Sequence, residues 1–137
     1  MVILDTNVLS AAMAADSAII AWLDRQPPSS MWTTSVTVFE IRYGLSTMPA
    51  GRRRAQQEIG FTHLLDHDLE RRVLAFDHEA AEHTAALMAA RRRRGRLGES
   101  RDAMIAGIAL AQRATLATRN VRHFGDLDVP VVDPWET

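Results

Sequence analysis

The sequence contains no cysteine, which excludes disulfide bonds and thiolate metal ligands. Any metal must therefore be held by oxygen or imidazole groups. Lysine is also absent, since every basic residue other than histidine is an arginine. The missing lysine excludes a P-loop nucleotide site and a receiver-domain phosphorylation site, and no glycine-rich dinucleotide loop is present.

Long hydrophobic runs are absent as well. The longest strongly apolar stretch covers residues 103–111, which is far too short to span a bilayer. The first residues lack the basic start and the small-residue cleavage site of a signal peptide. We expect neither export nor a membrane anchor, and therefore a cytoplasmic protein.

What is present fits one globular domain over residues 1–137, with 47% apolar and 24% charged residues. The net charge of −1 excludes a polycation, but the arginines occur in two runs, Arg52–Arg54 and Arg91–Arg94 with Arg96. Each run is explained either by a solvated helix face or by contact with phosphate groups, for which the planar guanidinium is well suited. Both explanations remain open at this stage.

Short apolar runs alternate with amphipathic segments along the chain. The pattern predicts strands over residues 2–4, 31–34, 73–75, 115–118 and 129–132. It predicts helices after residue 5 and over about 16–26, 35–47, 52–65, 77–95 and 100–111, with Asp16, Ser35, Asp77 and Ser100 as N-caps. This alternation indicates an α/β domain with a mainly parallel sheet of about five strands.

Polar side chains follow the predicted strands where ligands of such sheets bind, beyond the carboxyl ends. Asp5 ends the first strand, Asn120 follows the fourth, and Asp102 lies in the first turn of the last helix. Each also has a simpler explanation, because Asp5 and Asn120 are common turn residues and acidic residues favour the first turn of a helix. Taken together, they predict a site at one edge of the sheet.

Glu40 is the most informative single residue. It lies in the middle of a predicted helix, and its neighbours three and four positions away include no basic residue. A carboxylate in such a place is costly unless it is exposed, paired with a distant arginine, or neutralised by a metal ion. Three carboxylates and an amide in a protein without cysteine suit Mg²⁺ or Mn²⁺, which activate water for attack on a phosphodiester.

Four segments, in order, resemble the motifs of one known family. They are Val2–Ser10, Val38–Gly44, Asp102–Ala106 and Ala117–Phe124, followed by the ending Val132–Trp135. The set, which covers essentially the whole chain, is similar to the PIN-domain ribonucleases, and most of all to their VapC and FitB-like toxin branch. The resemblance implies a three-layer α/β/α sandwich and Mg²⁺-dependent endonucleolytic cleavage of RNA, with Mn²⁺ as an alternative ion.

The resemblance also implies roles for individual residues. Asp5, Glu40 and Asp102 match the acidic metal ligands, and Asn120 matches a fourth position that is often aspartate. In the implied mechanism Asp5 and Asp102 are the principal ligands, Glu40 ligates or positions the ion and the attacking water, and Asn120 orients water or a phosphate oxygen. The remaining matches are two hydroxyl residues that support the site, Thr6 and Thr118, and two candidates for RNA contact, Arg42 and Arg119.

Partners follow from the same resemblance. It implies a homodimer and a small antitoxin whose basic side chain enters the acidic site, with DNA contacted only indirectly through the antitoxin. A second hypothesis is a PIN-like module that binds RNA or protein without cleaving, which the asparagine at position 120 keeps open.

Overall fold

The computed structural model describes residues 1–136 of the chain. Its strands are β1 (Val2–Leu4), β2 (Met31–Thr34), β3 (Val73–Leu74), β4 (Thr115–Ala117) and β5 (Val131–Val132). Its α-helices are α1 (Thr6–Met13), α2 (Ser17–Asp24), α3 (Ser35–Thr47), α4 (Arg52–His63), α5 (His78–Arg93) and α6 (Ser100–Gln112). The shorter helical turns are η1 (Pro28–Ser30), η2 (Leu64–Asp68) and η3 (Val121–Phe124).

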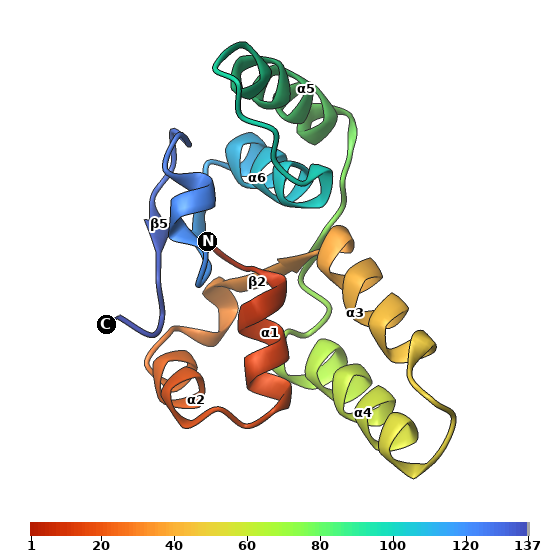
Figure 1. Cartoon of the computed structure of the whole chain (residues 1–137). Helices are drawn as coiled ribbons and strands as arrows, with labels where there is room; N and C mark the ends of the chain where they lie inside the picture. The colour runs from red at the N-terminus through yellow and green to blue at the C-terminus, as the bar shows by residue number, and fades with distance from the viewer. Residues whose placement is uncertain (137) are drawn as a thin grey trace.

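The strands form one sheet in the order β3-β2-β1-β4-β5, and every pairing in it is parallel. The chain therefore starts in the middle of the sheet, and β1 pairs with β2 on one side and with β4 on the other. Because all strands point the same way, their carboxyl ends meet at a single edge (Figure 1). The predicted α/β class with a parallel sheet is confirmed.

Helices cover both faces of the sheet. Successive residues of a strand point to opposite faces, so Leu4 lies in a buried cluster with α1, α2, α3 and α4, whereas Ile3 lies in a second buried cluster with α5 and α6. Leu116 and Ala117 of β4 divide in the same way between the two clusters. The predicted three-layer arrangement is confirmed, with one core on each side of the sheet.

Helix starts were predicted correctly in two places and wrongly in two. Asp16 and Asp77 cap α2 and α5 as expected, since each side chain accepts hydrogen bonds from backbone N–H groups of the first turn. Ser35 does not cap α3, because Thr34 Oγ1 accepts from Thr37 N instead, and the Ser35 hydroxyl accepts from Phe76 N. Ser100 is already the first residue of α6 rather than its cap.

The close approach of α5 and α6 depends on the glycine at position 107. A Cβ atom there would lie 1.8 Å from Thr84 Oγ1 and 2.7 Å from the carbonyl oxygen of Ala80, distances that no two atoms tolerate without moving. The Thr84 hydroxyl occupies this space while donating to the Ala80 carbonyl at 2.7 Å. The two helices can therefore lie in contact only because residue 107 has no side chain.

Among the described residues, no single helix is long and apolar enough to cross a membrane. Only α1 and α2 taken together meet the length and hydropathy requirement, and the two are bent by 108° relative to each other.

Candidate active site

Asp5 joins the end of β1 to the start of α1. Its backbone N–H continues the sheet by donating to the Ala117 carbonyl, and its side chain caps α1 by accepting from Thr6 N at 2.8 Å. Only 3% of the residue is exposed. The sequence suggested a turn former at this position, and the structure shows a buried helix cap at the carboxyl edge of the central strand.

Two residues hold the second oxygen of this carboxylate. The buried Thr118, just after β4, donates its hydroxyl to Asp5 Oδ2 at 2.7 Å. The Asn7 side-chain amide lies 3.4 Å from the same oxygen and 3.3 Å from Thr118 Oγ1, and its carbonyl accepts from Arg119 N. The supporting role expected of Thr118 thus has a structural basis, and Asn7 is a further support that was not predicted.

Glu40 is oriented by hydroxyl groups. Thr6 Oγ1 donates to Glu40 Oε1 at 2.8 Å, and Thr6 itself is 3.0 Å from Thr37 Oγ1, which belongs to the capped first turn of α3. On its other oxygen Glu40 faces Arg101 at 3.9 Å. The carboxylate is therefore partly neutralised by a distant arginine, one of the alternatives that the sequence left open. Thr6 contacts it directly, and the supporting role of Thr6 in the site stays a prediction.

Asp102 lies in the first turn of α6, as expected, with 27% of its side chain exposed. The imidazole of His123 in η3 faces it, with Nδ1 3.5 Å from Asp102 Oδ2. Neither Arg101 nor His123 was predicted to belong to the site. Both lie beside or within the quoted motifs, but only the folded chain shows which carboxylate each one faces.

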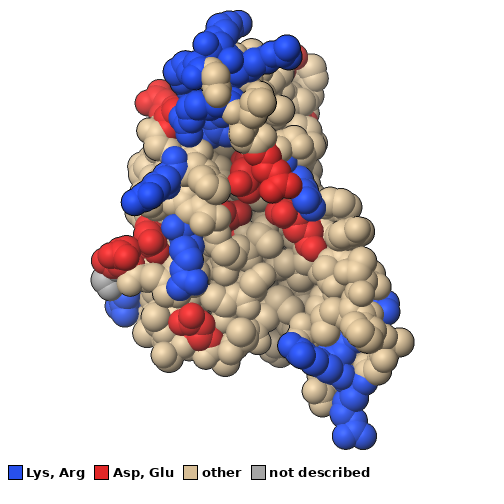
Figure 2. Space-filling view, in the orientation of Figure 1, with Lys and Arg blue, Asp and Glu red and all other residues tan. Residues whose placement is uncertain are grey.

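The three carboxylates influence one another electrostatically. Burial raises the pKa of the Asp5 carboxyl above its ordinary value, and the negative charges of Asp102 and Glu40 raise it further, while hydrogen bonds from Thr118 and Thr6 act in the opposite direction. This is the rise expected for acids that share a site without a cation. Figure 2 shows acidic surface in the middle of this face, over α6 and the start of α3.

The donor chemistry fits a hard divalent ion, although in residues 1–136 no three carboxylate or imidazole groups are gathered closely enough to enclose one. Mg²⁺ commonly uses only one or two protein carboxylates and keeps several waters, so a closed cluster is not required. A buried, cation-deficient Asp5 beside Asp102 and Glu40 provides suitable oxygen ligands. Their assignment as ligands remains a prediction.

The other predicted site residues lie at different distances from this centre. Asn120 is close in sequence to Thr118, whose hydroxyl accepts from its backbone N–H, but the Asn120 side chain is exposed. The Arg119 guanidinium lies over the Trp135 ring at 3.9 Å. Arg42 faces α4, where it donates to Thr62 and lies 4.7 Å from the Phe61 ring centre. The structure therefore brings Asn120 to the site edge but places the Arg42 side chain against α4.

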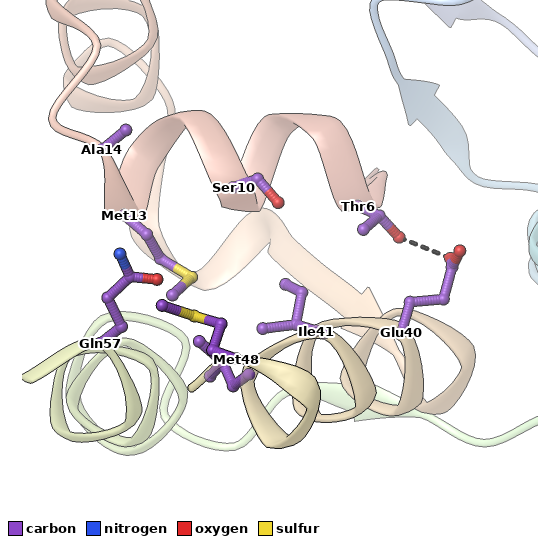
Figure 3. A pocket seen from close by; sticks show the side chains of 10 residues that line it. Thr6, Ser10, Met13, Ala14, Glu40, Ile41, Met48 and Gln57 are labelled. Atoms are coloured by element: carbon purple, nitrogen blue, oxygen red, sulfur yellow. Dashed lines mark hydrogen bonds between the residues drawn. The ribbon is translucent and has the colours of Figure 1, made fainter. Parts of the chain in front are cut away.

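A groove of about 300 Å³ leads away from Glu40 between α1, α3 and α4. Figure 3 shows the Thr6–Glu40 hydrogen bond at one end and Met13, Met48 and Gln57 at the other. Its walls are mainly apolar beyond the first turn of α1. The site thus continues into a mainly apolar groove rather than ending at the carboxylates.

Comparison with known proteins agrees with this geometry. The PIN-domain family matches residues 2–129. The chain is 36% identical to the VapC ribonuclease Y4jK of Sinorhizobium fredii and 37% identical to the plasmid stability protein StbB of Pseudomonas syringae pv. tomato, in each case over 99% of both chains. It is 28% identical to the toxin FitB of Neisseria gonorrhoeae, over 98% of this chain and 99% of FitB.

The solved structures agree with the sequence comparison. A chain in the structure of FitAB bound to the IR36 DNA fragment superposes with a TM-score of 0.88 at 29% identity, covering 98% of this chain and 96% of that one. The protein belongs to the PIN-domain family, in the branch that contains the VapC and FitB toxins. The resemblance inferred from the sequence motifs is confirmed.

Proposed function

We propose that this chain is a single-domain, metal-dependent endoribonuclease that acts in the cytoplasm as the toxin of a toxin–antitoxin pair. Its relatives are named as a VapC ribonuclease and a toxin, and PIN-domain nucleases are generally metal-dependent. The observation that carries the proposal is the buried Asp5 carboxylate, whose pKa is raised by burial and by two nearby acids. A bound cation would offset the cost of keeping this carboxylate ionised.

Each acidic residue has its own task in this proposal. Asp5 and Asp102 would hold the ion, which we take to be Mg²⁺ with Mn²⁺ as the alternative. When bound, the ion would supply an activated water and offset the charge that develops on the phosphate. Glu40, oriented by the Thr6 hydroxyl, positions the attacking water. Asn120 presents an exposed amide to a water or a phosphate oxygen.

Residues around the carboxylates keep their geometry. Thr118, just after β4, and Asn7, in the first turn of α1, both contact Asp5 Oδ2, so this oxygen is held by groups from two different segments. Arg101 lies beside Glu40, where its positive charge competes with a metal or contacts the substrate, and the His123 imidazole faces Asp102. Arg119 is close enough to Asn7 to share this edge of the sheet, so a backbone contact with RNA is retained for it.

Cleavage of a mixed structured RNA tests the proposal. Purified protein with Mg²⁺ or Mn²⁺ is expected to cut, and EDTA is expected to abolish the cuts. Asp5→Asn is expected to remove activity, while Asp24→Asn, which changes an exposed aspartate at the end of α2, serves as the matched control. Cleavage that persists equally in both variants would show a contaminating nuclease or a different active site.

The second candidate function is binding of RNA or protein without cleavage. Asparagine rather than aspartate at position 120 favours it, because the site then has one carboxylate fewer. A folded wild-type protein that binds RNA but makes no metal-dependent cuts would support this candidate.

Partners complete the proposal. We propose a cognate antitoxin that lies in the groove beyond Glu40 and brings a guanidinium or ammonium group to the carboxylates. DNA would then be contacted indirectly, through the antitoxin.

We also propose a homodimer, since α3 exposes Phe39 and Tyr43, stacked with ring centres 6.1 Å apart. Light scattering of the isolated protein measures its molecular mass and tests the dimer directly.

A further inference from the structure

The second arginine run contains one residue that is structural. Arg91, at the end of α5, is only 5% exposed and bonds both carboxylate oxygens of Asp126, at 2.9 and 3.0 Å. It also donates to the His123 carbonyl at 2.8 Å. Arg91 therefore fastens α5 to the segment around η3, and its Nε and Nη2 atoms are committed to that contact.

The next arginines depend on the same carboxylate. Arg94 reaches Asp126 at 3.1 Å and Arg96 at 3.5 Å, and their side chains are 51% and 46% exposed. Three guanidinium groups thus share one carboxylate that Arg91 already occupies on both oxygens. Two positive charges are left in excess at the solvent-facing side of this cluster.

These charges lie beside the candidate metal site. A cleft of about 370 Å³ is lined by Arg91, Arg96, Leu97, Gly98, Glu99, Asp102 and His123. Arg96 and Asp102 both line this cleft. Glu99, the other acid in the cleft, is paired with Arg101 at 3.0 Å and so does not cancel the excess. Figure 2 shows the arginine-rich end of α5 directly above the acidic surface.

We propose that Arg94 and Arg96 form a subsite for the RNA backbone, which binds phosphate groups next to the scissile phosphate that a metal ion would hold near Asp102. The inference rests on the proposed ribonuclease function and names how its substrate is placed. A polyanion approaching three carboxylates is repelled unless cations flank them, and arginine supplies both charge and paired donors for phosphate oxygens. A cleft that joins Arg96 to Asp102 gives the RNA strand one continuous path.

The proposal separates the roles within the run. Arg91 stabilises the fold, and Arg94 and Arg96 bind substrate. Arg92 and Arg93 are exposed and form no ion pair with any residue in 1–136, so they remain a solvated helix end. On this proposal, the two explanations that the sequence left open apply to different members of the run.

Binding of a fluorescein-labelled 12-nucleotide single-stranded RNA in EDTA, where no cleavage occurs, tests the subsite. The logarithm of the binding constant falls with the logarithm of salt concentration by about 0.7 per phosphate contact on single strands. The Arg94→Ala/Arg96→Ala variant should therefore show a slope about 1.4 units shallower than wild type. This corresponds to roughly 25-fold weaker binding at 0.1 M salt, with the two curves converging near 1 M.

The matched control is Arg52→Ala/Arg53→Ala. It removes the same charge from exposed positions at the start of α4, which Figure 1 shows at the opposite end of the molecule from α5. Because salt screens charges beyond about 10 Å at 0.1 M, the control slope should stay close to wild type. Equal losses in the two variants would reveal only a diffuse charge effect and would overturn the subsite.

Uncharged linkages placed in the RNA identify which of its phosphates contact Arg94 and Arg96. Replacing one phosphodiester at a time with methylphosphonate should weaken wild-type binding at one or two linkages and have little further effect in Arg94→Ala/Arg96→Ala. Unchanged affinity and slope in that variant would refute the subsite even if the wild type cleaves RNA. Conversely, a wild type that shows this salt dependence but never cuts would refute the ribonuclease and leave the subsite standing.

Discussion

Replacing Gly107 with alanine should strongly destabilise the protein, although alanine normally stabilises a helix. The new Cβ would lie 1.8 Å from Thr84 Oγ1, which can rotate away only by giving up its hydrogen bond to Ala80. It would also lie 2.7 Å from the Ala80 carbonyl oxygen, which is backbone and cannot rotate. Helix α6 and helix α5 must therefore move apart along their shared face.

The magnitude follows from three terms. Overpacking of a core costs about 1–3 kcal/mol, and an unsatisfied buried hydroxyl adds about 1–3 kcal/mol. The higher helix propensity of alanine returns about 1 kcal/mol. We therefore expect Gly107→Ala to lower the free energy of unfolding by about 3 kcal/mol, which moves the midpoint of urea unfolding down by about 1.5 M.

Gly60→Ala is the matched control, because Gly60 also lies inside a helix and an added Cβ there meets no atom within 4 Å. It should raise the free energy of unfolding by about 1 kcal/mol. Adding Thr84→Ala to Gly107→Ala should restore part of the loss but not all, since the Ala80 carbonyl stays in the way. Urea unfolding followed by circular dichroism measures all three, and a Gly107→Ala variant as stable as wild type would refute the packing argument.

For three further substitutions, the structure determines whether stability or RNA cleavage should rise or fall. The raised pKa of Asp5 means that the metal-free folded state is penalised as pH rises above about 3.8 through the folded-state pKa, so Asp5→Asn should raise the melting temperature in EDTA at pH 7. Thr118→Val, which removes the hydroxyl that donates to Asp5, should reduce RNA cleavage about 10- to 100-fold. Asp126→Asn should lower the free energy of unfolding at pH 7 by about 3 kcal/mol, because it leaves the buried Arg91 charge without its partner.

Each of these three predictions can be contradicted by a specific result. A lower melting temperature for Asp5→Asn in EDTA would mean that its charge is stabilised by groups other than a metal. Full cleavage by Thr118→Val would remove the threonine from the site. The pKa of Asp126 is lowered by its hydrogen bond with Arg91, so its stabilising effect is present above pH 3.8 and is lost as pH falls further. An Asp126→Asn deficit that persists unchanged under acid would contradict the ion pair.

The sequence predicted the elements well because their signals are local. Apolar runs of three or four residues located all five strands, and Asp16 and Asp77 marked helix starts through their own hydrogen bonds. The error at the start of α3 arose where a distant contact decides between two local signals. At the start of α3 two hydroxyl residues compete, and the choice of Thr34 over Ser35 depends on Phe76, which approaches from a segment 41 residues away.

The site was predictable in its carboxylates but not in their partners. Acidic residues after strands and in a first helical turn stand out in a sequence, so Asp5 and Asp102 could be named as candidate ligands, a role that stays a prediction. The pairing of Glu40 with Arg101 depends on how α3 and α6 lie against the sheet, and no spacing along the chain encodes it. The same holds for the hydrogen bonds from Asn7 to Thr118, which join residues 111 apart.

The central position of β1 also determines when, during synthesis of the chain, the candidate site can be completed. The first strand leaves the ribosome early, yet its partner β4 and the hydroxyl of Thr118 follow more than a hundred residues later. At about 5–20 residues per second, several seconds of synthesis pass before Asp5 acquires its full set of contacts. A nascent or prematurely terminated chain that stops short of residue 118 therefore lacks the Thr118 hydroxyl that holds Asp5, and the candidate site stays incomplete for most of translation.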